Sequence, residues 1–137
     1  MAEHPNAKAT REAWEALGGG DPGPLYELTH PDSVLHMGPG QAWLTGTYKG
    51  RDEIFTILVR SGQATRDSMK LEVHDVLAND DHVVALLRFG FDRDGNHLEG
   101  PECWVNHMAD GKVIETWVFI DDQADAQRFW SIATPDE

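Results

Sequence analysis

The sequence predicts an α+β fold in which helices pack on one face of a curved, mixed but mainly antiparallel sheet. Two observations support this prediction. Apolar residues recur at helical spacing in the first half of the chain, whereas the second half alternates with a period of two over four long segments. Tight-turn signals join these four segments in pairs, as expected of antiparallel hairpins.

The chain begins with two predicted helices. Residues 6–17 carry apolar side chains at helical spacing, Asn6 can cap this helix, and the three glycines at 18–20 end it. A second, short helix follows at Pro22. It ends before Pro31, because the residue preceding a proline disfavours the helical conformation.

A mixed segment comes next. Residues 33–37 (SVLHM) read as a strand that runs into the Gly-Pro-Gly turn at 38–40, and a brief strand is expected at 45–48. A third helix opens at 50–53, where acidic residues favour a helix N-terminus, and Gly62 closes it.

The last third of the chain contains the two predicted hairpins. Their turns are Asn79-Asp80-Asp81 and Asp110-Gly111. Asp121 and Asp122 then precede a final helix. The expected strands are residues 69–78, 82–91, 97–108 and 112–120.

Length and composition indicate a single domain over residues 1–137, with flexible termini at 1–5 and 132–137. No apolar run approaches the roughly 20 residues that a membrane span needs, and the N-terminus does not resemble a secretory signal. We therefore expect a cytoplasmic protein that does not enter a membrane. The single cysteine, Cys103, is expected to be a small buried apolar residue.

The charge balance argues against several partners. The 24 acidic and 11 basic residues give a formal net charge of −13, which repels nucleic acid and anionic lipid alike. The seven histidines lack metal-ligand spacing, so we expect no metal. The glycine-rich turns lack the strand-loop-helix context of a nucleotide site, so no flavin or nicotinamide cofactor is expected.

Five strings of sequence point to a known family. They are VLHMGPG, LTGTYKGRDEI, LEVHDVLANDDHVVAL, NHMADGKVIETW and DDQADAQRFWS, in this order along the chain. In this order and spacing they resemble the SnoaL-like branch of the nuclear transport factor 2-like superfamily. The resemblance implies a cone-shaped α+β barrel, in which a strongly bent sheet and the N-terminal helices enclose a central apolar pocket. The superfamily includes steroid isomerases, polyketide cyclases, epoxide hydrolases and proteins that only bind ligands.

The resemblance also implies a homodimer formed through the outer sheet face. The strand at 112–120 agrees with this, because it is apolar on both faces, and a strand with two apolar faces is normally covered on both sides.

His36 is the first candidate catalytic residue. In the steroid isomerase relatives the strand position that resembles it carries the carboxylate that moves the proton, and a neutral histidine can act as the same kind of base. We therefore predict that His36 faces the pocket. The alternative is a core or interface histidine with both ring nitrogens satisfied.

Trp104 and Asn106 share one face of their strand and could donate hydrogen bonds to a developing oxyanion. The alternative is that Trp104 is only part of the cavity wall. Trp104 stands where the steroid isomerases have a carboxylic acid donor, and Trp14 lies near the place of their helix-1 tyrosine. Both departures argue against steroid isomerisation in particular.

Asp121 is the second candidate catalytic residue, because the polyketide cyclase relatives have an acid/base carboxylate at what resembles this position. Burial beside Trp117 and Phe119 would raise its pKa toward neutrality. The alternative is that Asp121, like Asp122, only caps the final helix.

The aromatic residues suggest a pocket for a hydrophobic small molecule. The predicted binding residues are Trp14, Trp43, Tyr48, Phe89, Trp104, Asn106, Trp117 and Phe119. The leading hypothesis is a cofactor-independent isomerase, cyclase or epoxide/carbonyl hydrolase that acts by general acid–base chemistry. The alternative is a dimeric protein that binds such a ligand without turnover.

Overall fold

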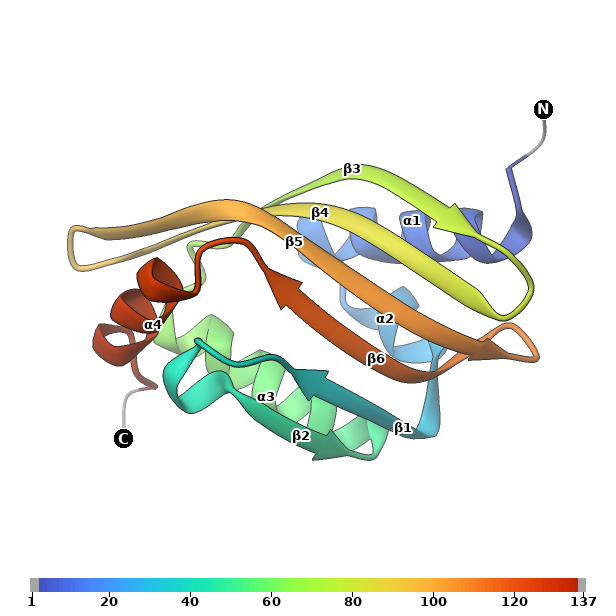
Figure 1. Ribbon diagram of the computed structural model, residues 1–137, viewed down its shortest axis with the longest axis horizontal. Coiled ribbons are helices and arrows are strands. Elements are labelled where there is room, and N and C mark those ends of the chain that lie inside the picture. The colour runs from blue at the N-terminus through green and yellow to red at the C-terminus, as the bar shows by residue number, and fades with distance from the viewer. Residues whose placement is uncertain (1–2, 136–137) are drawn as a thin grey trace.

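The computed structural model describes residues 3–135, which form one six-stranded sheet and the helices that pack on it (Figure 1). In chain order the elements are α1 (Pro5–Gly18), α2 (Gly23–Leu28), β1 (Thr29–Met37), the 3₁₀ helix η1 (Ala42–Leu44), β2 (Gly46–Lys49), α3 (Arg51–Ala64), β3 (Lys70–Ala78), β4 (His82–Arg93), β5 (Asn96–Ala109), β6 (Lys112–Ile120) and α4 (Gln123–Ile132).

The strand order is β2-β1-β6-β5-β4-β3. β1 and β6 pair in parallel, and every other neighbouring pair is antiparallel. The sheet is therefore mixed but mainly antiparallel, which confirms the predicted fold class. It stays open, with β2 and β3 as its two edges.

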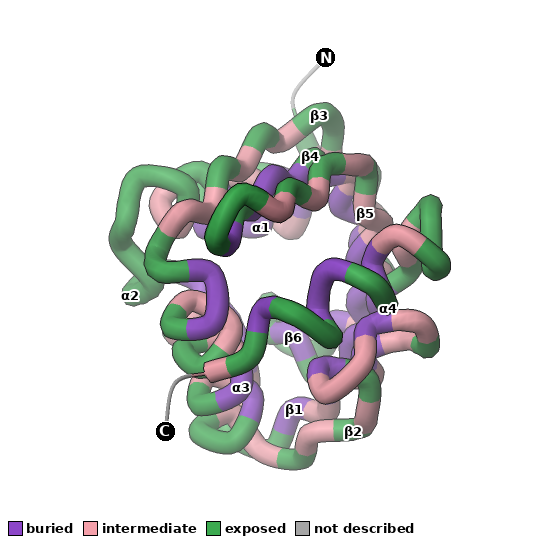
Figure 2. The backbone as a smooth tube through the Cα atoms, turned by 90° about the vertical axis from the view of Figure 1, so that its left-hand side faces the viewer, coloured by how far each residue is buried: buried purple, intermediate pink, exposed green. Residues whose placement is uncertain are grey.

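The helices lie inside the curve of the sheet. In Figure 2 the strands bend from β3 at the top to β2 at the bottom, while α1 and α3 lie on the inner side of the bend. α1 contacts β3 and β4, α3 contacts β1 and β2, and α4 contacts β5 and η1. The buried faces of these helices and of the sheet enclose the core, as expected for a cone-like fold.

Several boundaries differ from the prediction. α1 begins at Pro5 with His4 as its N-cap, and His4 Nδ1 accepts a hydrogen bond from the Asn6 backbone N–H. Asn6 is therefore not the cap, because Pro5 already suits the first helical position. α3 continues past Gly62 to Ala64.

β1 begins at Thr29, four residues before its predicted start at residue 33, and the hairpin of β4 and β5 also differs. These strands are longer than predicted and meet at Asp94 and Gly95, which both have positive φ. This second Asp-Gly turn has the same chemistry as the one at Asp110-Gly111.

The termini were expected to be flexible. Residues 1–2 and 136–137 lie outside the described residues. Within the described part, Ala133 is fully buried, and its carbonyl accepts a hydrogen bond from the Trp43 indole. No helix among residues 3–135 is long and apolar enough to cross a bilayer.

Candidate active site

A cavity of about 600 Å³ lies between the inner face of the sheet and the helices. Its wall combines side chains from α1, the β1–η1 segment, α3, β4, β5 and α4, so it forms only when these distant parts of the chain come together. Most of the lining is apolar. The volume falls within the range of roughly 300–1,000 Å³ that is usual for small-molecule sites.

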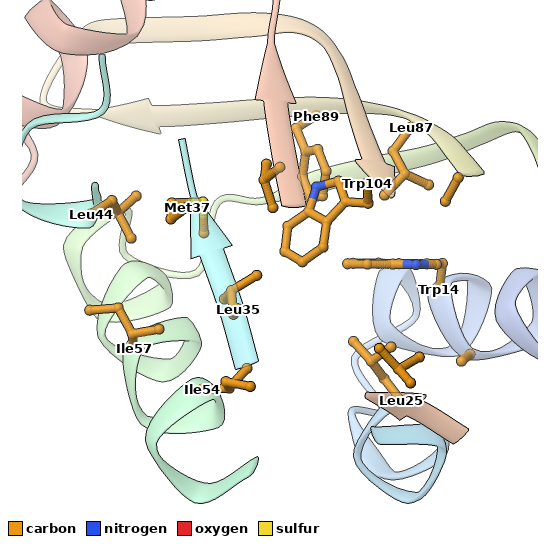
Figure 3. Packing of buried hydrophobic residues seen from close by; sticks show 14 of the residues in the cluster. Trp14, Leu25, Leu35, Met37, Leu44, Ile54, Ile57, Leu87, Phe89 and Trp104 are labelled. Atoms are coloured by element: carbon orange, nitrogen blue, oxygen red, sulfur yellow. The ribbon is translucent and has the colours of Figure 1, made fainter. Parts of the chain in front are cut away.

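Aromatic rings form one wall of this cavity, and Figure 3 shows Trp14 from α1 lying against Trp104 from β5. Their ring centroids are 4.8 Å apart in an edge-to-face arrangement, and Phe89 meets Trp14 in the same way at 6.2 Å. Because each ring holds its neighbour, this wall is rigid. Three of the predicted binding residues, Trp14, Phe89 and Trp104, therefore line the cavity.

Glu102 is the ionisable group buried in this wall. It lies on β5 two residues before Trp104, on the inner face, and Trp104 Nε1 donates a hydrogen bond of 3.0 Å to Glu102 Oε1. Glu102 is partly exposed and borders two further hollows besides the main cavity, while protein packs densely around its carboxyl group. Burial raises the pKa of Glu102 to about 7, against the smaller opposing effect of the Trp104 N–H. Near neutral pH this carboxyl group can both give up and accept a proton.

Two further polar groups in the lining lack partners. Trp14 Nε1 and Gln41 Nε2 are buried, and neither makes a hydrogen bond within the described residues. Trp14 belongs to α1, and Gln41 precedes η1. The wall therefore carries Glu102 and several polar residues, Asp67 among them, on a mostly apolar surface.

A smaller hollow of about 30 Å³ adjoins the same aromatic wall. Asn106 lines this hollow and not the main cavity, and Asn106 Oδ1 accepts a hydrogen bond of 2.7 Å from Thr116 Oγ1. The Trp104 indole N–H is already bonded to Glu102. The pair predicted to stabilise an oxyanion therefore does not present two free donors to the cavity.

The structure contradicts the predicted orientation of His36. Leu35 and Met37 are buried on the inner face of β1, so His36 between them points to the outer face. There His36 Nε2 lies 2.6 Å from Glu115 Oε2, and the imidazole stacks on Trp117 with centroids 5.2 Å apart. His36 is an outer-face histidine with a carboxylate partner, and it does not reach the cavity.

The predicted burial of Asp121 is also wrong. Asp121 follows the end of β6, is exposed, and does not line the main cavity. Its neighbour Asp122 caps α4, as predicted, through a hydrogen bond of 2.9 Å that its Oδ1 accepts from the Asp125 backbone N–H.

Four of the predicted binding residues lie elsewhere. Trp117 and Phe119 are on the outer face of β6, because Thr116 and Val118 take the buried inner positions. The other two, Trp43 and Tyr48, do not line the cavity. Both are held by hydrogen bonds to backbone carbonyls, of Ala133 and Leu44 respectively.

The predicted site residues do not include Glu102 or Gln41. For Glu102 the sequence does carry a signal, because residues 102, 104 and 106 of one strand share a face. Gln41 lies in an irregular segment, where no periodicity places a side chain.

Comparison with known proteins agrees with this architecture. A family model described as a SnoaL-like domain matches residues 10–116, which is most of the chain. The chain belongs to the SnoaL-like family. Among its relatives is the uncharacterised protein Rv0034 of Mycobacterium tuberculosis, which is 28% identical over 132 residues that cover 96% of this chain and 100% of the relative.

Solved structures share the fold of this SnoaL-like chain. Bal32a, from a soil-derived mobile gene cassette, is 31% identical and superposes with a TM-score of 0.85 over 92% of this chain and 96% of its own. IdmH from Streptomyces antibioticus, a candidate polyketide cyclase, is 22% identical with a TM-score of 0.69 over 87% and 93% of the two chains. At that identity the likeness to IdmH concerns the fold alone.

Proposed function

We propose that this SnoaL-like protein is an isomerase or cyclase that acts on a hydrophobic carbonyl compound by general acid–base chemistry, with Glu102 as the group that transfers the proton. The observation that carries the proposal is the carboxyl group of Glu102 in an aromatic wall of a large apolar cavity, with a pKa of about 7. Perturbed carboxyl groups in such places are typical of functional sites.

The chemistry follows from the two states of Glu102. As a carboxylate it takes a proton from the carbon next to a carbonyl, and the substrate becomes an enolate. As the resulting carboxylic acid it returns the proton to a different carbon, which shifts a double bond, or to an oxygen while a ring closes. A pKa near the working pH suits both steps, because the carboxylate and the carboxylic acid are then both well populated.

The family supports this class of reaction. SnoaL-like domains belong to a fold that suggests polyketide cyclase or isomerase chemistry, and IdmH is a candidate polyketide cyclase with the same fold.

Proton exchange tests the proposal without knowledge of the natural substrate. The probe is 2-tetralone in D₂O, whose C1 hydrogens exchange through an enolate that NMR detects as deuterium incorporation. We expect the wild-type protein to accelerate this exchange. We expect Glu102→Gln to lose at least about 100-fold of the acceleration, because general acid–base groups typically contribute that much.

Asp121→Asn is the matched control, since it makes the same chemical change to a carboxylate outside the main cavity. It should exchange 2-tetralone at the wild-type rate. If Glu102→Gln is as active as the wild type, the proposal is wrong. If the wild-type protein binds the ketone but leaves its exchange rate unchanged, the protein is a ligand-binding protein.

We also propose that a second copy of this chain covers the outer sheet face. Phe119 on β6 is 57% exposed there. Together with the half-buried Trp117 it leaves a central strand of the sheet with aromatic side chains facing outward. A sheet with two apolar faces is normally covered on both.

A further inference from the structure

We propose that the main cavity binds a hydrophobic ammonium ion, with Glu102 as its counter-ion and the aromatic wall as the surface on which its apolar part packs. This goes beyond the proposed reaction, because it adds a cationic class of ligand. It requires the negative charge of Glu102 but no proton transfer to or from a substrate. Three features of the cavity support it: a buried carboxyl group without a counter-charge, a lining without basic residues, and several aromatic rings.

Glu102 lacks a counter-charge. Within residues 3–135 it forms no ion pair, and the group that stabilises its carboxylate is the neutral Trp104 N–H at 3.0 Å. Arg88 and His74 border an outer hollow together with Glu102, but neither affects its pKa. The Arg88 guanidinium lies 3.8 Å from Glu99 Oε2 instead. A buried carboxylate without a partner is costly, and a cation bound beside it removes that cost.

The cavity lining holds acidic groups and no basic ones. Within residues 3–135 its ionisable groups are the carboxyls of Glu102 and of the exposed Asp67, with no lysine, arginine or histidine. A neighbouring hollow that Glu102 also borders contains three further acids, Glu99, Asp121 and Asp122. A cation that enters the main cavity therefore meets no like charge in its lining. The net charge of −13 attracts the cation from a distance.

Aromatic rings make up much of the same lining. The six side chains are Trp14, Phe55, Phe89, Phe91, Trp104 and Trp130. Figure 3 shows Trp14, Phe89 and Trp104 gathered beside one another. Aromatic rings attract cations, tryptophan most strongly, and the attraction grows where water is excluded. The wall that holds Glu102 therefore offers an ammonium ion both a carboxylate and electron-rich rings, while the apolar body of the ligand packs on the same rings.

The charge of Glu102 determines the pH at which the cation binds. Because the pKa of Glu102 is about 7, the carboxylate predominates at pH 8, whereas the neutral acid predominates at pH 5. An aliphatic amine stays protonated throughout this range, as lysine does. At pH 7 about half of the Glu102 side chains hold a proton, so binding of a cation that requires the carboxylate releases that proton.

Calorimetric titration with two ligands of one skeleton tests the inference. 2-Aminotetralin carries an ammonium group, and 2-tetralol has a neutral hydroxyl in its place. At pH 8 we expect the amine to bind about tenfold to 100-fold more tightly than the alcohol, which is the range of a hydrogen bond to a charged group. At pH 5, where Glu102 is neutral, the two affinities should agree within about threefold.

Proton release tests the same contact without a substitution. Titration of the wild-type protein at pH 7 in phosphate and in HEPES, whose ionisation enthalpies differ, gives the number of protons released per bound ligand. We expect about 0.5 for 2-aminotetralin and none for 2-tetralol, because about half of the Glu102 side chains are protonated at this pH.

Two variants locate the counter-ion. Glu102→Gln keeps the shape of the side chain and removes its charge, so the amine should bind no more tightly than the alcohol at pH 8. The alcohol should bind to this variant as it does to the wild type, which reports an intact cavity. Asp67→Asn makes the same change at the exposed carboxyl group of the lining. It should leave the preference for the amine within about threefold of the wild type, because exposed charges interact weakly.

Four results would overturn the inference. At pH 8 the amine could fail to bind more tightly than the alcohol, or Glu102→Gln could keep the preference for the amine. No proton could be released at pH 7, or Asp67→Asn alone could abolish the preference, which would place the ammonium ion beside Asp67. The 2-tetralone exchange assay is a separate measurement. A wild-type protein that prefers the amine but does not accelerate exchange would contradict the catalytic proposal and support this one.

Discussion

Trp104 Nε1 donates a hydrogen bond to Glu102 Oε1 across 3.0 Å, from a residue two positions further along the same strand. Two effects on the pKa of Glu102 oppose each other at this point. Burial favours the neutral acid, the indole N–H favours the carboxylate, and burial is the larger effect. The pair therefore holds a carboxyl group near the midpoint of its titration at neutral pH.

The raised pKa of Glu102 predicts how stability depends on pH. Between about pH 4.5 and 7 the folded state retains a proton that the unfolded state has released, so the free energy of unfolding falls as pH rises through this window. Glu102→Gln removes this dependence and keeps an acceptor for Trp104. We expect the variant to match the wild type near pH 4.5 and to be more stable by about 1–3 kcal/mol at pH 8.

Urea denaturation at several pH values measures this difference. Asp121→Asn serves as the control. The difference between its free energy of unfolding and that of the wild type should not grow from pH 4.5 to pH 8. A constant difference between Glu102→Gln and the wild type from pH 4.5 to pH 8 would contradict the raised pKa.

Trp104→Phe removes the donor to Glu102 and retains an aromatic wall. Because the lost hydrogen bond favoured the carboxylate, the pKa of Glu102 should rise further. The midpoint of the pH–rate profile for 2-tetralone exchange should therefore move to higher pH. Phe89→Leu alters the same wall without touching this bond, and its midpoint should stay in place. A shift of the Trp104→Phe midpoint to lower pH would mean that water enters and solvates the carboxylate.

His36→Gln tests the orientation of that residue. The imidazole and its partner Glu115 are on the outer face and are both about one third exposed. We expect 2-tetralone exchange within about twofold of the wild-type rate, and a loss of stability below about 1 kcal/mol, as for other partly exposed pairs. If His36→Gln folds normally but loses most of the exchange rate, His36 takes part in catalysis, which would contradict its position outside the cavity.

Phe119→Asp tests the proposed dimer. A charge at this exposed position of β6 should prevent a second copy from covering the face, so light scattering should show a monomer where the wild type is a dimer. Ile132→Asp is the control, because Ile132 is 45% exposed on α4 and away from the sheet. A monomeric wild-type protein at micromolar concentration would contradict the proposal.

Gly38→Ala tests the close approach of β1 and β6. A Cβ at Gly38 would lie 2.6 Å from the backbone oxygen of Val118, so the two strands would have to separate. We expect a loss of about 1–3 kcal/mol in thermal or urea unfolding, as for other overpacked sites. Gly100→Ala on β5 meets nothing within 4 Å and should be neutral or slightly stabilising.

Much of the fold could be predicted from the sequence, because local chemistry specifies it. The tight turn at 79–81 and the Asp-Gly turn at 110–111 identified both hairpins, and the change of period separated helices from strands. The hairpin of β4 and β5 is longer than predicted, because its strands continue to a second Asp-Gly turn at Asp94-Gly95.

The sequence by itself determined which residues share a face of each strand, because side chains alternate with a period of two. It did not determine which face meets the helices, since β1 and β6 carry apolar residues on both sides. Only the tertiary packing decided this choice. It placed Leu35 and Met37 inward and therefore His36 outward, and it brought Glu102 of β5 beside the cavity that α1, α3 and α4 close. Burial among these distant elements is also what raises the pKa of Glu102, and no local pattern in the chain encodes it.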